Sequence, residues 1–144
     1  MPQRKKPEAR RLQRPKFPTE EYEQKVVIAW AKAHEAYYPR LMLLHASMNG
    51  ILTNVRFAAK LKSLGRKAGV PDLFLPCSQV IWDEIAELRL VKCGLFIEMK
   101  RTKGGTVSDE QEWWHAALRA QGYEVKVARG ATEAIKTIKE YLEI

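Results

Sequence analysis

Two charged side chains interrupt an apolar stretch that otherwise predicts a buried strand. In "GLFIEMK" (residues 94–100), Glu98 and Lys100 are two residues apart, so both point to one face of a strand, because side chains alternate between its faces. Burying a carboxylate and an ammonium is costly unless each has a partner. Asp72 begins the preceding apolar stretch "DLFLP" and would lie beside both if the two strands pair. The pattern predicts a cluster of two acids and one lysine.

Two carboxylates beside an ammonium suit a hard divalent cation such as Mg²⁺, with the backbone carbonyl of Met99 as a further candidate ligand. The chemistry that fits is phosphodiester hydrolysis. A cation would offset charge on the phosphate and polarise water, and Lys100 would add positive charge where negative charge develops. A solvated strand face or a simple ion pair also explains the same residues, so the pattern alone leaves these alternatives open.

The chain is strongly basic, with a formal charge of +8 over 144 residues and a pI near 9.6. Such a balance favours a polyanionic partner, most often nucleic acid. The opening "MPQRKKPEARRLQRPKFP" holds seven Arg or Lys, four prolines and one Glu, a composition that predicts a flexible basic arm over residues 1–18. The remaining length, residues 19–144, fits a single domain.

Neither a membrane span nor a secretory signal is visible, because the basic N-terminal stretch lacks an apolar core. We therefore expect a cytoplasmic protein. The two cysteines, Cys77 and Cys93, are too few for a disulfide framework and too far apart for a metal knuckle, so reduced thiols without a chemical role are expected.

Capping residues and apolar spacing predict an α/β domain around a small central mixed sheet flanked by helices. Helices are expected after Thr19, over 54–67, after Ser108 and over 132–142, and strands over 41–45, 72–76, 94–100 and 123–129. Residues 78–93 are ambiguous, with a hint of one or two helical turns. The expected core-facing residues of the first helix are Tyr22, Val26, Ala29, Trp30 and Ala33, and those of the third include Trp113 and Trp114.

The segment between Glu35 and Asp72 contains no acidic residue. Its helix, residues 54–67, is expected to pack through Phe57, Leu61 and Leu64. On another side it presents a basic strip that includes Arg56, Lys60 and Lys67. Such a strip contacts phosphates without reading bases.

Several motifs agree, in order, with one known family. The stretches "NGILTNVRFAAKLKSLGRKAGVPDLFL" and "GLFIEMKRTKGGTVSDEQEWWHAALRAQGYEVKVARGATEAIKTIKEYL" carry an Asn-Gly turn, an Arg-bearing helix, Gly-Val-Pro-Asp, Ile-Glu-Met-Lys and a Ser-x-x-Gln helix start. From about Glu20 to Leu142 the chain resembles the VRR-NUC family, the virus-type replication-repair nuclease branch of the PD-(D/E)XK superfamily. The resemblance implies a restriction-endonuclease-like fold, Mg²⁺ or Mn²⁺ as cofactor, and structure-selective DNA cleavage.

Residue by residue, the resemblance implies that Asp72 and Glu98 are metal-binding carboxylates and that Lys100 is the catalytic lysine. Gln111 falls where the family has a glutamine after this lysine. A second explanation for Gln111 is a capping box with Ser108, which needs no catalysis. Both explanations remain open.

The family also has a glutamate on its first helix, and the sequence offers Glu20 or Glu23, with Glu20 slightly favoured. Acidic residues at a helix N-terminus are also favourable without any catalytic role. Arg101 and Lys103, just after the lysine, are candidate phosphate contacts. His115, one turn after Gln111, could face the site, but it is better explained as a surface or core-edge histidine.

By resemblance, free-standing members are homodimers that cut four-way (Holliday) junctions. The resemblance also suggests a phage or prophage as the source, so we expect the protein in a bacterial or phage-infected cell. Val80 to Leu90 is the candidate dimer interface. Flaps, nicked duplexes and single strands remain alternative substrates. A function of another class, a non-catalytic DNA-binding protein that retains the fold, has the same charge pattern but no need of the Asp72, Glu98 and Lys100 set.

Overall fold

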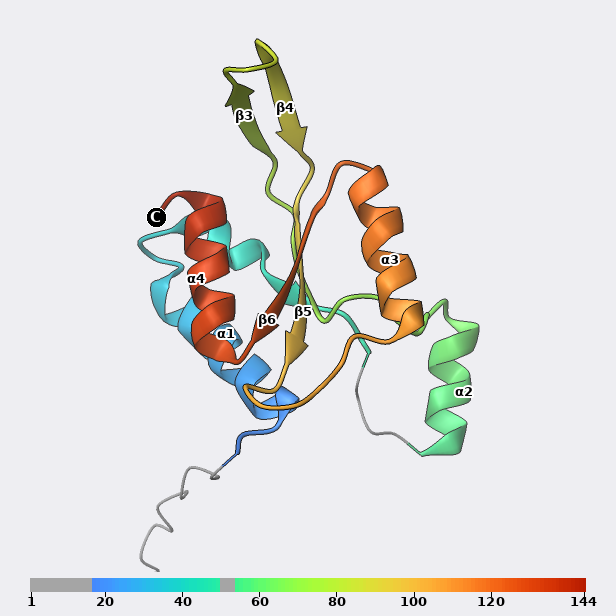
Figure 1. Cartoon of the computed structure of the whole chain (residues 1–144). Coiled ribbons are helices and arrows are strands. Elements are labelled where there is room, and N and C mark those ends of the chain that lie inside the picture. The colour runs from blue at the N-terminus through green and yellow to red at the C-terminus, as the bar shows by residue number, and fades with distance from the viewer. Residues whose placement is uncertain (1–16, 50–53) are drawn as a thin grey trace, which may run out of the picture.

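The computed structural model describes residues 17–49 and 54–144 (Figure 1). In chain order the elements are α1 (Glu20–His34), the 3-10 helix η1 (Pro39–Leu43), β1 (His45–Ala46), α2 (Val55–Ser63), β2 (Leu73–Leu75), β3 (Gln79–Asp83), β4 (Leu88–Lys92), β5 (Leu95–Lys100), α3 (Asp109–Ala120), β6 (Glu124–Arg129) and α4 (Ala131–Leu142). A four-stranded sheet has the order β1-β2-β5-β6, and β3 and β4 form a separate two-stranded sheet. Within the larger sheet β5 and β6 are parallel, and the other pairs are antiparallel. The predicted α/β fold with a small mixed sheet is confirmed.

The two faces of the central sheet are covered by different helices. Leu95, Ile97 and Met99 of β5 are fully buried in a core shared with α1 and α4, which lie together on one side of the sheet (Figure 1). Helix α3 covers the other side. The alternation of the strand therefore places its apolar side chains in the core and leaves Glu98 and Lys100 beneath α3.

Three helices begin where their capping residues predict. The side chains of Thr19 and Asn54 each accept a hydrogen bond from the backbone nitrogen three residues later, at 3.1 and 2.9 Å. Ser108 and Gln111 form a reciprocal capping box at the start of α3. These bonds satisfy backbone donors that have no partner inside the helix.

The buried stripe of α1 differs from the predicted one. Glu23, Val27 and Ala31 are buried, whereas Ala29 and Ala33 are exposed. The stripe follows a spacing of four residues, but it begins with a glutamate, so an apolar pattern does not reveal it. Its first member is explained by a contact with α4 described below.

The predicted strand over 41–45 is wrong in most of its length. Pro39 to Leu43 form a 3-10 helix, and only His45 and Ala46 pair with β2. Pro39 at the start of η1 has a φ that suits a helical turn. A short apolar run does not distinguish a buried strand from a buried helical turn.

Residues 78–93, where a helical turn or two was expected, form a β-hairpin instead. Strands β3 and β4 pair antiparallel from Gln79↔Lys92 to Asp83↔Leu88. In the turn, Oδ1 of Asp83 accepts hydrogen bonds at 2.9 Å from the backbone nitrogens of the second and third residues after it. The β-branched and aromatic residues of β3 favour a strand and prevail over the helical spacing.

Helix α2 ends at Ser63, earlier than predicted, and has no buried residue. Of its predicted packing residues, Phe57 and Leu64 are exposed, as is Trp113 of α3. Figure 1 shows α2 at the edge of the molecule, beside the start of α3, so little of the protein covers its apolar side.

The remaining expectations concern the chain ends, the cysteines and the membrane. Cys77 and Cys93 are free thiols, as predicted. In the two described ranges, no helix has the length and apolar character needed to cross a bilayer. The predicted basic arm falls outside the described residues except for Phe17 and Pro18, and so does Gly50 of the Asn-Gly turn.

Candidate active site

Strand pairing brings Asp72 to Glu98. Strands β2 and β5 are antiparallel neighbours with Leu73 opposite Ile97, so Asp72, one residue before β2, lies level with Glu98. Oδ2 of Asp72 accepts a hydrogen bond of 2.7 Å from the backbone nitrogen of Met99. The condition set by the sequence, that the two strands pair, is met.

Glu98, Lys100 and Gln111 form one hydrogen-bonded group beneath α3. Nζ of Lys100 donates to Oε1 of Glu98 at 2.8 Å and to Oε1 of Gln111 at 3.2 Å. Nε2 of Gln111 donates to Oε1 of Glu98 at 2.5 Å. Oε1 of Gln111 also accepts a bond of 3.0 Å from the backbone nitrogen of Ser108. Gln111 therefore takes part in the capping box and in the acid–lysine cluster together.

Burial raises the pKa values of both acids in this cluster. Glu98 is 1% exposed, and this burial, reinforced by the negative charge of Asp72, raises its pKa to about 7 against the attraction of Lys100. Burial also raises the pKa of Asp72, opposed by its bond to Met99 and by Lys100. A cluster of this kind gains from a further positive charge.

The oxygen atoms of Asp72, Glu98 and the Met99 backbone suit a metal ion that binds to few protein ligands. Oε2 of Glu98 is buried and has no hydrogen-bond partner among the described residues, and Asp72 and the Met99 backbone are adjacent. In the described part of the chain, no three His, Cys, Asp or Glu side chains are grouped to hold an ion by themselves. Mg²⁺ is commonly held by one or two carboxylates together with water and substrate phosphate, so the residues present suit it.

The two candidate glutamates of α1 have separate surroundings. Glu20 and Asp72 both line a cleft of about 650 Å³, which we call the Asp72 cleft, and the charge of Glu20 contributes to the raised pKa values of Asp72 and Glu98. Glu23 is buried, and its Oε2 accepts a bond of 2.8 Å from the backbone nitrogen of Ala131, at the start of α4. Glu20 therefore lies near the cluster, whereas Glu23 caps the N-terminus of α4.

A glycine turn borders the cluster after β5. Gly105 has a φ of 78°, and a Cβ there would lie 3.5 Å from Oε1 of Glu20 and 3.5 Å from Cδ of Lys100. Nη1 of Arg129 donates to the carbonyl oxygens of Gly104 and Gly105 at 2.9 and 3.2 Å. The sequence did not single out Gly105 or Arg129, and nothing in the spacing of motifs connects Arg129 with this turn.

His115 lies closer to the cluster than the sequence suggests. It is 4% exposed, and its Nε2, also buried without a partner among the described residues, lies 3.9 Å from Oε2 of Glu98. Burial lowers its pKa, with the charge of Arg119 acting in the same direction. Its position four residues after Gln111 is the signal that places it on the same side of α3.

The predicted phosphate contacts lie on the surface. Arg56 and Lys60 of α2, Lys67 after it, and Arg101 and Lys103 after β5 are all exposed. The chain places Arg101 and Lys103 directly after Lys100 of the acid–lysine cluster.

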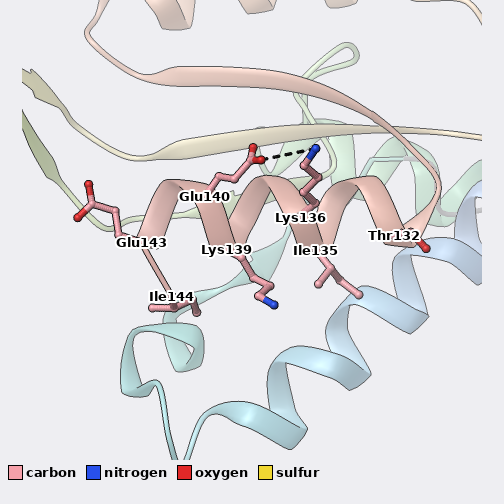
Figure 2. A pocket seen from close by; sticks show the side chains of 7 residues that line it. All are labelled: Thr132, Ile135, Lys136, Lys139, Glu140, Glu143 and Ile144. Atoms are coloured by element: carbon pink, nitrogen blue, oxygen red, sulfur yellow. Dashed lines mark ion pairs between the residues drawn. The ribbon is translucent and has the colours of Figure 1, made fainter.

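A second hollow in the surface lies away from the cluster. It runs along α4 and contains the Lys136–Glu140 ion pair (Figure 2). Its lining residues are Thr132, Ile135, Lys136, Lys139, Glu140, Glu143 and Ile144. None of them belongs to the predicted site.

Comparison with known proteins agrees with this geometry. A family model described as the VRR-NUC domain matches residues 6–132. A solved structure described as a VRR_NUC domain protein is 28% identical to this chain and superposes on it with a TM-score of 0.68. The match covers 88% of this chain and 89% of the other one. No curated protein matches. Since the family model spans most of the chain, this protein belongs to the VRR-NUC domain family.

Proposed function

We propose that this protein is a DNA endonuclease that hydrolyses phosphodiester bonds with the help of Mg²⁺ or Mn²⁺. The observation that carries the proposal is the convergence of Asp72, Glu98 and Lys100 at one end of two paired strands. Membership of a nuclease-type family supports it. A protein that only binds DNA has no need of a buried acid, Glu98, beside a half-buried one, Asp72, when the pKa values of both are raised.

Asp72, Glu98 and the carbonyl of Met99 are the proposed metal ligands. When bound, the metal would supply a Lewis acid that activates water and offsets phosphate charge. Lys100 holds its ammonium between Glu98 and Gln111, where its charge stabilises negative charge that develops on the phosphate. Gln111 orients both of these side chains. Glu20, which lines the Asp72 cleft, is the proposed third acid of the site.

DNA would be held through its phosphates. The exposed cations Arg56, Lys60 and Lys67, with Arg101 and Lys103 beside the cluster, are the proposed contacts. Cations that neutralise phosphates release counterions, so affinity should fall steeply with salt. Contacts of this kind follow the backbone and do not read base edges, which favours selection by DNA shape, with four-way junctions as the proposed substrate.

A homodimer is the proposed assembly, with the β3–β4 hairpin as the contact between copies. Val80, Ile81, Trp82 and Val91 of the hairpin are between 47% and 62% exposed, and an isolated two-stranded sheet is barely stable in water. A second copy of the chain would cover these side chains. A monomer in sedimentation at micromolar concentration would contradict this assembly without affecting the proposed chemistry.

The direct test is cleavage of a labelled four-way junction with and without Mg²⁺. We expect metal-dependent products from the wild type and a loss of about a hundredfold or more in rate for Lys100→Ala and Lys100→Met. Lys139→Gln, on the α4 hollow of Figure 2, removes a charge away from the cluster and should cleave normally. Thermal melting of each variant shows whether it is folded.

Two outcomes would separate the alternatives. Equal amounts of intact DNA in every lane, together with salt-sensitive binding, would identify a non-catalytic DNA-binding protein. Faster cleavage of flaps, nicked duplex or single strands than of the junction would retain the enzyme and change its substrate. Paired nicks placed symmetrically about the junction would support a two-fold assembly.

A further inference from the structure

The guanidinium of Arg66 contains a buried donor without a partner. Nη1 of Arg66 has no hydrogen-bond partner among residues 17–49 and 54–144. A buried N–H that is not hydrogen-bonded costs free energy, and the cost is larger for a charged group. Arg66 as a whole is half-buried, so its guanidinium would gain an acceptor by turning toward a bound anion.

The end of α2 fixes where Arg66 leaves the helix. Gly65 adopts a φ of 98°, its nitrogen donates to the carbonyl of Lys62 at 3.1 Å, and the nitrogen of Arg66 donates to the carbonyl of Leu61 at 3.0 Å. This pair of bonds is a Schellman motif, which closes a helix with a left-handed residue. Arg66 is therefore held by the backbone and does not sit on a loose loop.

Arg66 lines a pocket of about 350 Å³, which we call the Arg66 pocket. Arg66 and Lys67 supply two cations, and no described lining residue is acidic. Its apolar lining residues are Met48, Leu61, Leu64 and Val70. Charge attraction is stronger beside apolar walls than in open water, so the pocket suits a single phosphate group.

The Arg66 pocket and the Asp72 cleft adjoin the same loop, residues 47–49. Ser47, Met48 and Asn49 line both of them. This loop is tied to the segment before β2, since the nitrogen of Ser47 donates to the carbonyl of Asp72 at 2.7 Å and Nδ2 of Asn49 donates to the carbonyl of Val70 at 2.8 Å. One nucleic-acid strand that crosses the loop would touch both hollows.

We propose that Arg66 binds a phosphodiester group of the DNA strand that is cut, adjacent to the phosphate presented to Asp72. This proposal rests on the proposed nuclease function, and it adds one defined contact between the protein and the DNA strand that is cut. The planar guanidinium matches two phosphate oxygens at once, so Arg66 sets the register of the strand across the Ser47–Asn49 loop.

Binding and cleavage should separate this role from catalysis. Anisotropy of a fluorescein-labelled four-way junction, in EDTA and from 50 to 200 mM KCl, compares wild type, Arg66→Gln, Arg66→Lys and Lys139→Gln. For Arg66→Gln we expect affinity to fall about tenfold and the log–log salt slope to fall by about one. Arg66→Lys should keep the slope and lose part of the affinity, because it keeps the charge without the fork. Lys139→Gln should match wild type.

Each outcome of these measurements supports or contradicts the proposed phosphate site. If wild type binds and cleaves DNA while Arg66→Gln keeps its affinity and slope, the phosphate site is wrong and the nuclease remains. If wild type neither binds nor cleaves DNA, both proposals fail together. If Arg66→Gln melts early, Arg66→Lys decides, and an affinity equal to wild type would overturn the site. With Mg²⁺ and a range of junction concentrations up to saturation, Arg66→Gln should raise KM far more than it lowers kcat.

Discussion

Oε2 of Glu23 lies 2.8 Å from the backbone nitrogen of Ala131, so a carboxylate of α1 caps the start of α4. Gly130 precedes that helix and supplies no side-chain cap. The buried acid of α1 therefore has a structural task, and the neighbouring cleft is left to Glu20. Two glutamates that the sequence could not separate have distinct surroundings for this reason.

This contrast predicts that substitution of Glu23 lowers stability, whereas substitution of Glu20 lowers the cleavage rate. Glu23→Ala leaves a buried N–H without its acceptor and should lower the free energy of unfolding by about 1–3 kcal/mol. Glu20→Gln should leave stability almost unchanged and slow junction cleavage. Urea unfolding and single-turnover cleavage of both variants check this, and a slow, destabilised Glu20→Gln protein would contradict it.

Gln111 and Ser108 separate the cap of α3 from the cluster beneath it. Ser108→Ala removes only the cap and should cost about 1 kcal/mol of stability with cleavage retained. Gln111→Ala removes the cap partner and the contacts to Glu98 and Lys100 and should slow cleavage by about 10–100-fold. If the two variants cleave equally fast, Gln111 serves the helix alone.

The raised pKa of Glu98 predicts a pH-dependent stability. Its carboxyl loses a proton near pH 4.5 when unfolded and near 7 when folded, so the folded state holds more protons between these values. Stability therefore falls as the pH rises from about 4.5 to 7, by up to about 3 kcal/mol from this group. Urea unfolding in EDTA at pH 5 and pH 8 should show the loss for wild type and a smaller one for Glu98→Gln.

Metal binding should reverse that loss. At pH 8 a cation that binds the ionised Glu98 stabilises the folded state, by about 2.7 kcal/mol at one hundred times its dissociation constant. Mg²⁺ should raise the melting temperature of wild type and leave that of Glu98→Gln nearly unchanged. An equal rise in both proteins would place the ion elsewhere.

Two glycines with similar positive φ angles, Gly65 and Gly69, offer a matched test of close packing. A Cβ on Gly69 would lie 2.8 Å from the Trp114 side chain and 2.9 Å from the Glu110 backbone, whereas a Cβ on Gly65 would meet nothing within 4 Å. Both have a positive φ, which costs about 1–2 kcal/mol for alanine. Gly69→Ala should cost about 1–3 kcal/mol more, because the backbone must shift. Equal melting temperatures would contradict the close contact of this loop with α3.

The parts of the fold that depend on neighbouring residues could be predicted from the sequence. Alternation in β5 put Glu98 and Lys100 on one face, and capping residues marked the starts of α1 and α3. The pairing of β2 with β5 was stated as a condition, because strand neighbours are set by the whole sheet. The sequence thus led to the set of residues that the structure brings together, while their roles remain predictions.

Other features depended on distant contacts that no local pattern records. Glu23 is buried because α4 begins beside it, and His115 is buried because α3 lies on β5. The helical spacing of Ile81, Ile85 and Leu88 was a coincidence within a hairpin whose residues are all exposed at these positions. No local pattern distinguishes Arg66 from the neighbouring cations, because its unpartnered nitrogen and its pocket depend on the folded structure.

The β3–β4 hairpin also has a consequence for how the molecule folds. Asp72 and Met99 are 27 residues apart, and bringing such distant segments together costs loop-closure entropy. A hairpin forms in about 1–10 μs, and once closed it leaves only short connections between β2 and β5. The closed hairpin therefore brings the two segments close together, so substitutions that weaken it should slow refolding and leave the proposed cleavage rate of the folded protein unchanged.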